Sequence, residues 1–269
     1  MKASLAGANF RRLILGLLVP VLALALWQEL GSTPRLSGVL PTPLAVLGAW
    51  EQWLFGKPGR GLNPYLGTWL ANVEYSAFRV LQGFALAALV GVPLGLLIGW
   101  NRLMAHLFDP MIQGLRPIPI TAWLPFSIAL FGIRDMGSIF LIFLGGFYAI
   151  VVNTTQGARD VDRNLMRAAL MMGATSAQIL RRVVLPSAMP SIFTGLRIGL
   201  GIAWTAVIVS EMVAVKSGLG YVLWDAYYVG RMDIVIADMV SIGIMGYLSD
   251  RLIVWVERRT LVWRQLQSH

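Results

Sequence analysis

The chain has 269 residues, of which 57% are hydrophobic and 13% charged, and its mean hydropathy is +0.69. These values exclude a soluble globular domain and indicate a membrane protein. A net charge of +9 would suit nucleic acid, but the basic residues lie in the gaps between apolar runs, as the positive-inside rule of membrane proteins predicts. The absence of cysteine excludes a disulfide framework, a thiolate metal site and a thiol nucleophile.

The first apolar run, Leu13 to Leu30, is about as long as a membrane-spanning helix needs to be. It follows three basic residues, Lys2, Arg11 and Arg12. A cleaved signal peptide is the alternative, but Trp-Gln-Glu at 27–29 stands in place of the small residues of a cleavage site. We therefore predict a first span with residues 1–12 in the cytoplasm.

Residues 31–69 are rich in proline, glycine and tryptophan and contain no run that could span a membrane. We interpret them as an outer, interfacial segment. Within it, Leu44 to Phe55 is predicted to form a short helix on the membrane surface, with Trp50 and Trp53 at the level of the lipid headgroups.

The second predicted span, Val73 to Trp100, carries Gly91, Gly95 and Gly99 at four-residue intervals. Small residues at this spacing form a flat groove that lets another helix approach closely. The pattern therefore predicts helix packing and no chemistry.

The third predicted span begins near Phe108 and contains Pro110, Pro117, Pro119 and Pro125, which bend or break a helix. Irregular backbone is tolerated in a membrane where it is buried in protein or lines a cavity. We therefore predict that this stretch contributes to a translocation path, with the candidates Arg116, Pro117, Pro119, Thr121 and Trp123. The alternative is that the prolines only kink a packed helix.

After an outer turn at 131–137, a fourth span is predicted at Ser138 to Asn153, which is short but could extend to Gln156, and a fifth at Ile192 to Val213. Glu211 lies near the outer end of the fifth and is either a structural anchor or a gate, and it is a further candidate for the translocation path. An outer segment at 216–233 precedes the sixth span, Ile234 to Val256. The spans form one transmembrane domain, residues 13–256, and residues 257–269 form a cytoplasmic tail. Twelve basic residues fall on the inner side of this topology and six on the outer side.

Between the fourth and fifth spans lies a basic loop, residues 157–190, which this topology places in the cytoplasm. Leu165, Ala168, Ala169 and Met172 recur at helical spacing, and Gly173 then interrupts the pattern. Thr175 and Gln178 stand three apart, as in a capping box, and Pro186 is predicted to end the helix that follows. The pattern therefore predicts a helix, a glycine turn and a second helix in this loop.

The spacing of Ala168-Ala169, Gly173 and Val183-x-Leu185-Pro186 resembles the EAA loop of the membrane subunits of binding-protein-dependent ABC importers. In that family the loop is a coupling helix that seats in a groove of a separate ATPase subunit. An ordinary amphipathic cytoplasmic loop is the alternative. Arg167 stands where the motif has Glu. The resemblance implies the coupling residues Arg167, Ala168, Ala169, Gly173, Ala174, Val183, Leu185 and Pro186.

Four further stretches are similar to the nitrate, sulfonate, taurine and bicarbonate branch of these importers: LRPIPITAWLP at 115–125, FGIRD at 131–135, GLRIGLGIAW at 195–204 and SGLGY at 217–221. The resemblance implies an all-α membrane protein of about six spans with the type I importer (MetI-like) permease fold. It also implies a small anionic solute, an aliphatic sulfonate or taurine first, with nitrate, bicarbonate or cyanate as the alternatives. Arg116 and Arg197 could offset the charge of an anion or could form structural ion pairs.

The sequence has no phosphate-binding loop of the form GxxxxGK[ST], and no HExxH or GxSxG motif. We therefore expect no catalytic residue, no metal site and no cofactor on this chain, with ATP and Mg²⁺ held by the partner. The expected partners are two ATPase subunits, a soluble binding protein, a second permease copy and the lipid bilayer, and no nucleic acid. The expected location is the cytoplasmic (inner) membrane of a bacterium, with both termini inside. A secondary transporter or channel is the alternative, but few ionisable residues lie at mid-span.

Overall fold

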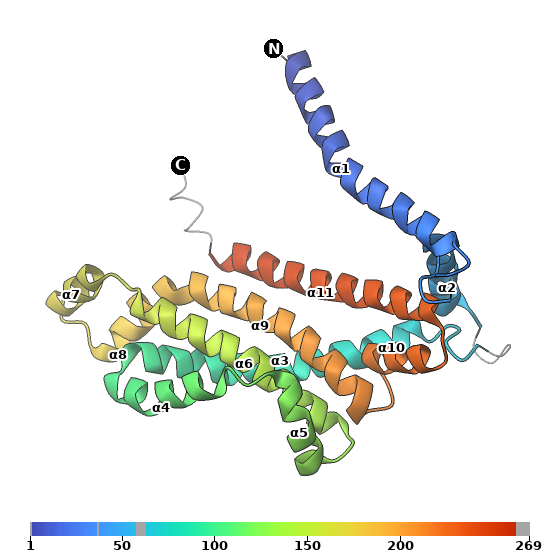
Figure 1. Cartoon of the computed structure of the whole chain (residues 1–269). Helices are drawn as coiled ribbons and strands as arrows, with labels where there is room; N and C mark the ends of the chain where they lie inside the picture. Colours follow the sequence, from blue (N-terminus) through green and yellow to red (C-terminus); the bar gives the residue numbers. More distant parts are fainter. Residues whose placement is uncertain (1, 37, 58–62, 262–269) are drawn as a thin grey trace. The chain divides into compact units, whose positions relative to one another are not determined.

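The computed structural model describes residues 2–36, 38–57 and 63–261, and within these ranges it contains helices and no strands. Of the residues used in the charge count, Arg60 and Arg264 lie outside the described ranges, as does the predicted tail beyond residue 261. The helices, in chain order, are α1 (Lys2–Ser32), α2 (Pro43–Phe55), α3 (Trp69–Trp100), α4 (Arg102–Leu115), η1 (Ile120–Trp123), α5 (Leu124–Phe131), α6 (Asp135–Arg159), α7 (Arg163–Met171), α8 (Ser176–Ile179), η2 (Leu180–Val184), α9 (Leu185–Ala214), α10 (Leu219–Tyr228) and α11 (Met232–Thr260) (Figure 1).

Four described helices are long and apolar enough to cross a membrane: Trp69–Trp100, Asp135–Arg159, Ser176–Ala214 and Met232–Thr260. A fifth span is formed if Arg102–Leu115 and Ile120–Phe131 are taken together, and these two segments are bent by 93°. The second, fourth, fifth and sixth predicted spans therefore correspond to helices of sufficient length and hydropathy, and the third does so if the bent pair is counted as one span. For the first, the apolar part of α1, Gly16–Ser32, is shorter than the others.

The chain divides into two compact units, one of Met1–Leu70 with Val222–Val240 and one of Ala71–Tyr221 with Ser241–His269. In the first unit, α2 begins where Thr42 Oγ1 accepts a hydrogen bond from the Ala45 amide. Trp53 of α2 is fully buried, and its indole N–H donates to Thr68 Oγ1 at 3.2 Å. The predicted short helix is thus confirmed, and its place on the membrane surface stays a prediction. Trp53, predicted to face the lipid headgroups, is instead a core residue of this unit.

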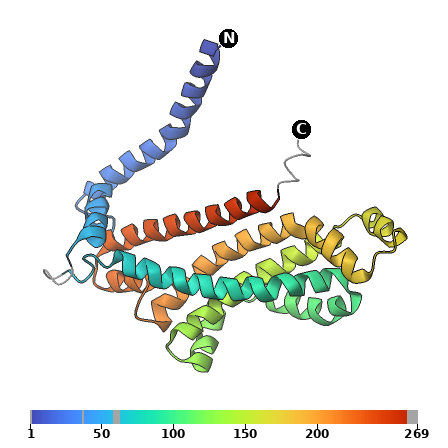
Figure 2. The same cartoon turned by 180° about the vertical axis from the view of Figure 1, so that it is seen from behind.

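In the second unit, α3 and α6 run parallel and in contact (Figure 2), because the glycines of α3 leave room for α6. A Cβ at Gly95 would lie 2.7 Å from Thr154 Cβ and 2.8 Å from the Val151 carbonyl oxygen. A Cβ at Gly91 would likewise crowd the side chain of Ile150, and one at Gly99 the side chain of Ala158. The predicted packing role of these three glycines is confirmed.

Helix α9 packs on another face of α6 and runs in the opposite direction. Gly199 lies against the backbone of Gly146, and Gly157 lies against Ser191. Both views show α3, α6 and α9 alongside one another (Figures 1 and 2). Helix α6 is therefore the central element of this unit.

Helices α6 and α9 extend beyond the predicted spans, so the intervening segment is shorter than the predicted loop of 157–190. The polar run after Val152 suggested the end of the fourth span. However, Thr154 and Thr155 are buried, and Thr155 Oγ1 donates to the Gly95 carbonyl at 3.1 Å. The prediction that Pro186 ends a helix is wrong. Pro186 lies in the first turn of α9, where a missing N–H is tolerated.

We expect Gly95→Ala to lower the free energy of unfolding by about 1–3 kcal/mol, because the added methyl group overpacks the α3–α6 contact. Gly246→Ala in α11 is the matched control, since no atom of a described residue lies within 4 Å of a Cβ there. Thermal unfolding of the purified variants in detergent measures the difference. Equal midpoints for the two variants would contradict the packing assignment.

Candidate functional site

The segment between α6 and α9, residues 160–184, forms a helical knuckle with a small core of its own. The core consists of Ala158, Val161, Ala169, Ile179 and Val184, all buried. Leu96 and Trp100 of α3 also pack against it. Since α3 and α6 both contribute to this core, the knuckle is held against two spans, and Figure 1 shows α7 and α8 at one end of the α6–α9 pair.

The turn at the tip of the knuckle is built by local hydrogen bonds. Gly173 has φ +78°, a left-handed conformation that favours glycine, and the next amide, of Ala174, donates back to the Ala169 carbonyl at 3.1 Å. Thr175 and Gln178 form the predicted capping box, in which Gln178 Oε1 accepts from the Thr175 amide at 2.8 Å. Helix, glycine turn and helix are thus confirmed.

The second helix of the knuckle joins α9 through η2, a π-helical turn in which the Leu185 amide donates to the Leu180 carbonyl. Ile179 and Val184 are five residues apart, and both are almost fully buried in the knuckle core. An i→i+5 turn brings residues five apart onto one face, so the π-turn is what seats both side chains.

Large apolar side chains are exposed on the knuckle. Met171 is 89% exposed and Met172 81%, and Leu165 and Leu170 are each more than half exposed. Beside them lies a hollow of about 400 Å³, lined by Ala169, Met172, Gly173, Ala174, Gln178, Ile179, Arg182 and Val183. Apolar surface of this kind typically marks a protein–protein contact. The sequence pattern had included Met172 but had not singled out Met171 or Leu170.

The structure distributes the eight predicted coupling residues unevenly. Arg167, Ala168 and Gly173 are exposed, Ala169 is buried in the knuckle core, and the remaining four are half-buried: Ala174, Val183, Leu185 and Pro186. The last two belong to α9. The contact of these residues with an ATPase remains a prediction.

A second cavity, of about 530 Å³, lies at the bend between α4 and η1. It is lined by 116–120, by Gly145, Tyr148, Ala149, Val152 and Asn153 of α6, and by Ile198 and Ile202 of α9. Arg116, Pro117 and Pro119 therefore share one cavity. Thr121 is exposed outside this lining, and Trp123 packs against the cluster around Ile112 and Tyr148.

The two arginines proposed as partners for an anion differ in their surroundings. Arg197 forms a two-point ion pair with Asp250 of α11, with N–O distances of 2.8 and 3.1 Å. Arg116 is exposed and forms no ion pair with any described residue, and its cavity has no carboxylate in the lining. Of these two arginines, Arg197 is thus neutralised by a carboxylate, whereas Arg116 has no ionic partner among the described residues.

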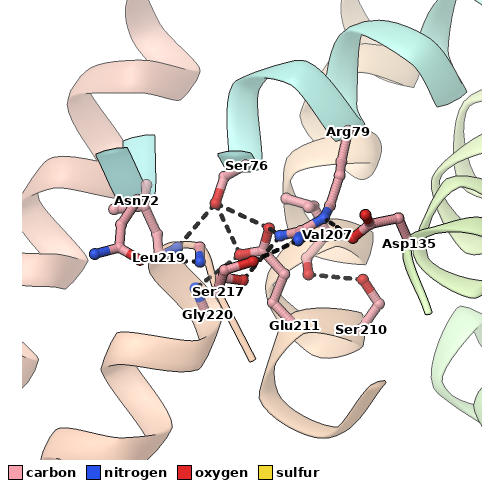
Figure 3. Close-up of polar contacts among 11 residues, drawn as sticks. Asn72, Ser76, Arg79, Asp135, Val207, Ser210, Glu211, Ser217, Leu219 and Gly220 are labelled. Atoms are coloured by element: carbon pink, nitrogen blue, oxygen red, sulfur yellow. Dashed lines mark hydrogen bonds and ion pairs between the residues drawn. The ribbon is translucent and has the colours of Figure 1, made fainter. Parts of the chain in front are cut away.

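Glu211 lies in a buried polar network, shown in Figure 3. Its side chain has no exposed surface and accepts hydrogen bonds from Ser76 Oγ, from Arg79 Nη1 at 2.7 Å and from the Gly220 amide at 2.9 Å. Ser76 Oγ also accepts a hydrogen bond from the Leu219 amide. Glu211 therefore ties the start of α10 to α3, and in this conformation it does not line the cavity at Arg116.

Sequence reasoning missed the partners of Glu211, above all Arg79. The available signal was a basic residue within the apolar second span, since ionisable residues in membrane helices usually have a specific partner.

The family model described as the binding-protein-dependent transport system inner membrane component matches residues 91–262. The chain belongs to this family. It is 40% identical to an ABC transporter permease protein of Methanocaldococcus jannaschii, over 97% of this chain and 96% of that relative. It is 33% identical to an aliphatic sulfonates transport permease of Bacillus subtilis (93% and 87% covered) and 36% identical to a nitrate import permease of Synechocystis (87% and 84% covered).

The fold is similar to that of a chain of the MetNI methionine ABC transporter in an inward-facing conformation. The TM-score is 0.63 at 21% identity, covering 71% of this chain and 95% of that chain. The predicted MetI-like fold is confirmed. The chain is an ABC importer permease of the nitrate, sulfonate and bicarbonate branch.

We expect Glu211→Gln to lower the free energy of unfolding of the permease by about 3 kcal/mol, because Arg79 loses its buried counter-charge. Glu74→Gln is the control, since Glu74 is exposed on the same helix and forms no ion pair with a described residue. The thermal midpoint and the yield of monodisperse protein measure the effect. A Glu211→Gln variant as stable as Glu74→Gln would show that the network is not needed for folding.

Proposed function

We propose that the permease forms the path for a small anionic solute and is driven by a separate ATPase that binds the knuckle. The proposal of an anionic solute rests on Arg116, which forms no ion pair with a described residue and lies in a cavity whose described lining has no carboxylate. A guanidinium without an ionic partner can bind an anion that enters the cavity, through charge-assisted hydrogen bonds. Relatives named for aliphatic sulfonates and for nitrate support this class of solute. An alkanesulfonate or taurine is proposed first, then nitrate, bicarbonate or cyanate.

A second copy of the permease is proposed to complete the path. The Arg197–Asp250 pair lies within two spans, yet the side chains are 45% and 35% exposed in the single chain. Charged groups that face lipid are costly, so this surface is expected to be covered by protein or to face water. Gly201 on α9 also has open space around it. Two copies packed side by side would cover both features.

The ATPase is proposed to bind the exposed side chains of the knuckle, with one ATPase for each permease copy. ATP and Mg²⁺ are proposed to bind to the ATPase. Moving a two-state transporter from 1% to 99% in one state takes about 5.5 kcal/mol of differential binding. Such energy reaches the spans only if the knuckle moves with them as a rigid body. The buried core shared by the knuckle, α3 and α6 supports this requirement.

The topology is proposed to place the knuckle and both termini in the cytoplasm, and the opposite end of α6 toward a soluble binding protein. Basic residues are twice as numerous on the predicted inner side, twelve against six, which supports this orientation. The membrane is proposed to be the inner membrane of a bacterium.

Replacing Met171 and Met172 together by Asp should abolish binding of the ATPase while leaving the permease folded, because both side chains are exposed and make little contact within the chain. Replacing both by Leu keeps the apolar surface and should preserve binding. Co-purification with the ATPase and the thermal midpoint test this pair of variants. Full ATPase binding by the Asp variant would rule out the knuckle tip as the contact.

Arg116→Gln should lower the rate of anion uptake about tenfold, which corresponds to losing one charge-assisted hydrogen bond. Arg116→Lys keeps the charge and should retain more of the uptake. Initial rates in vesicles that hold permease, ATPase and binding protein measure both variants. Equal rates for Gln and wild type would remove Arg116 from the path.

The function as a whole is tested by reconstitution. Vesicles holding the permease, its ATPase and its binding protein should accumulate the ligand that calorimetry identifies for that binding protein, and only when ATP is present. Accumulation by the permease alone would instead support a secondary transporter or channel.

A further inference from the structure

We infer that Arg79 is a positioning residue for transport, and that its contact with Asp135 is a latch that opens when the end of the path opposite the knuckle opens. The inference rests on the proposed function and goes beyond it, because it names the contact that closes this end. The latch consists of Arg79 of α3 and Asp135 of α6, with Glu211 and Ser217 as the fixed partners of Arg79 (Figure 3).

Arg79 joins three segments that are distant in sequence. Its Nε donates to Asp135 at 2.8 Å, its Nη1 to Glu211 and to the Ser217 carbonyl, and its Nη2 to Ser217 Oγ at 2.7 Å. Every nitrogen of the guanidinium is therefore engaged, and the side chain itself is only 5% exposed. A planar fork held in this way fixes the segment 215–218 against α3 and α6.

The two carboxylates on Arg79 are in opposite environments. The Glu211 side chain is 0% exposed, whereas that of Asp135 is 64% exposed. Separating Glu211 from Arg79 would leave a buried charge without a partner, which is strongly unfavourable. Separating Asp135 from Arg79 exposes a carboxylate that water already reaches, which costs little. Asp135 is thus the partner that can leave while the rest of the network stays intact.

The surroundings of Asp135 give it room and other partners. A cavity of about 580 Å³ is lined by Arg79, Asp135, Arg134 and Lys216, together with Tyr75, Ile133, Met136, Val215 and Ser217. Arg134 and Lys216 form no ion pair with any described residue. A carboxylate released from Arg79 therefore has two cations within the same cavity to receive it.

Helix α6 links the latch to the knuckle. Asp135 is its first residue and Arg159 its last, so the helix is about 37 Å long. Ala158, near its far end, belongs to the knuckle core, and α5, which follows the bend of 93°, is joined to its near end through the turn at Gly132. A displacement of the knuckle is thus carried along one continuous helix to the residue that can be released.

The test uses the complete complex of permease, ATPase and binding protein in vesicles. Asp135→Asn should raise the ATP hydrolysis measured without binding protein at least threefold, and should lower the stimulation by binding protein, because the resting closure is weakened. The thermal midpoint should stay at the wild-type value. Asp135→Glu should restore tight coupling. Asp233→Asn is the matched control, because Asp233 also pairs with an arginine, Arg231, at 2.9 Å, and lies outside the network.

An unchanged basal rate in Asp135→Asn would overturn the latch, and so would a large fall in its thermal midpoint, which would indicate a purely structural contact. A wild-type complex that binds no ATPase would instead overturn the proposed function.

A second measurement leaves the latch residues untouched. The chain has no cysteine, so Met136→Cys, in the same cavity, gives a single thiol. Its labelling rate should change at least threefold between the nucleotide-free complex and the complex trapped with ATP and vanadate. Equal rates in the two states would contradict the opening.

Discussion

Helix α6 lies against α3 on one face and α9 on another at distances that only glycine permits, and the second unit depends on this double contact. On α3 the glycines at 91, 95 and 99 leave the space, and on α9 Gly195 and Gly199 do so. Within lipid, helices gain little from hydrophobic burial against one another, so close backbone approach and van der Waals contact carry the association. A bundle held in this way transmits displacements as a packed solid.

Much of this architecture could be predicted from the sequence, because its signals are local. Glycines at four-residue spacing predicted a close helix contact, which is made with α6. The prolines of the third span predicted a bend or break, which lies at 116–119, and Thr175 with Gln178 predicted the cap. The features that were missed depend on partners distant along the chain. Nothing near Arg79 in the sequence indicates that it meets Glu211 and Asp135, and nothing near Thr154 indicates that this polar side chain is buried against α3.

Pro186 is an informative error. A proline after an apolar run usually ends a helix, but here it lies in the first turn of α9, directly after the π-turn, and the helix continues past it. A Leu-Pro pair is compatible both with the end of a helix and with its first turn. Here Pro186 is placed in the first turn of α9 by the preceding π-turn. That turn could not be predicted, because it is favoured by the packing of Ile179 and Val184 in a core formed by three segments.

The two ends of α6 are held by different forces. At the knuckle, apolar side chains form the contact, and the energy of such contacts depends little on the relative orientation of the groups. At Asp135 the contact is a set of charge-assisted hydrogen bonds with fixed geometry. A small rotation of α6 would therefore be absorbed at the first end and would break bonds at the second.

The π-turn at Leu180–Val184 also lets the packing of α8 in the knuckle and the packing of α9 on α6 be met by different faces of the helix. A regular α-helix without this turn would fix one face relative to the other. An extra residue in one turn shifts every later side chain around the helix axis by about 100°. The face that α8 presents to the knuckle and the face that α9 presents to α6 therefore need not fall on the same stripe of the sequence. The exposed surface of the knuckle can therefore vary between relatives without disturbing the register of α9 on α6.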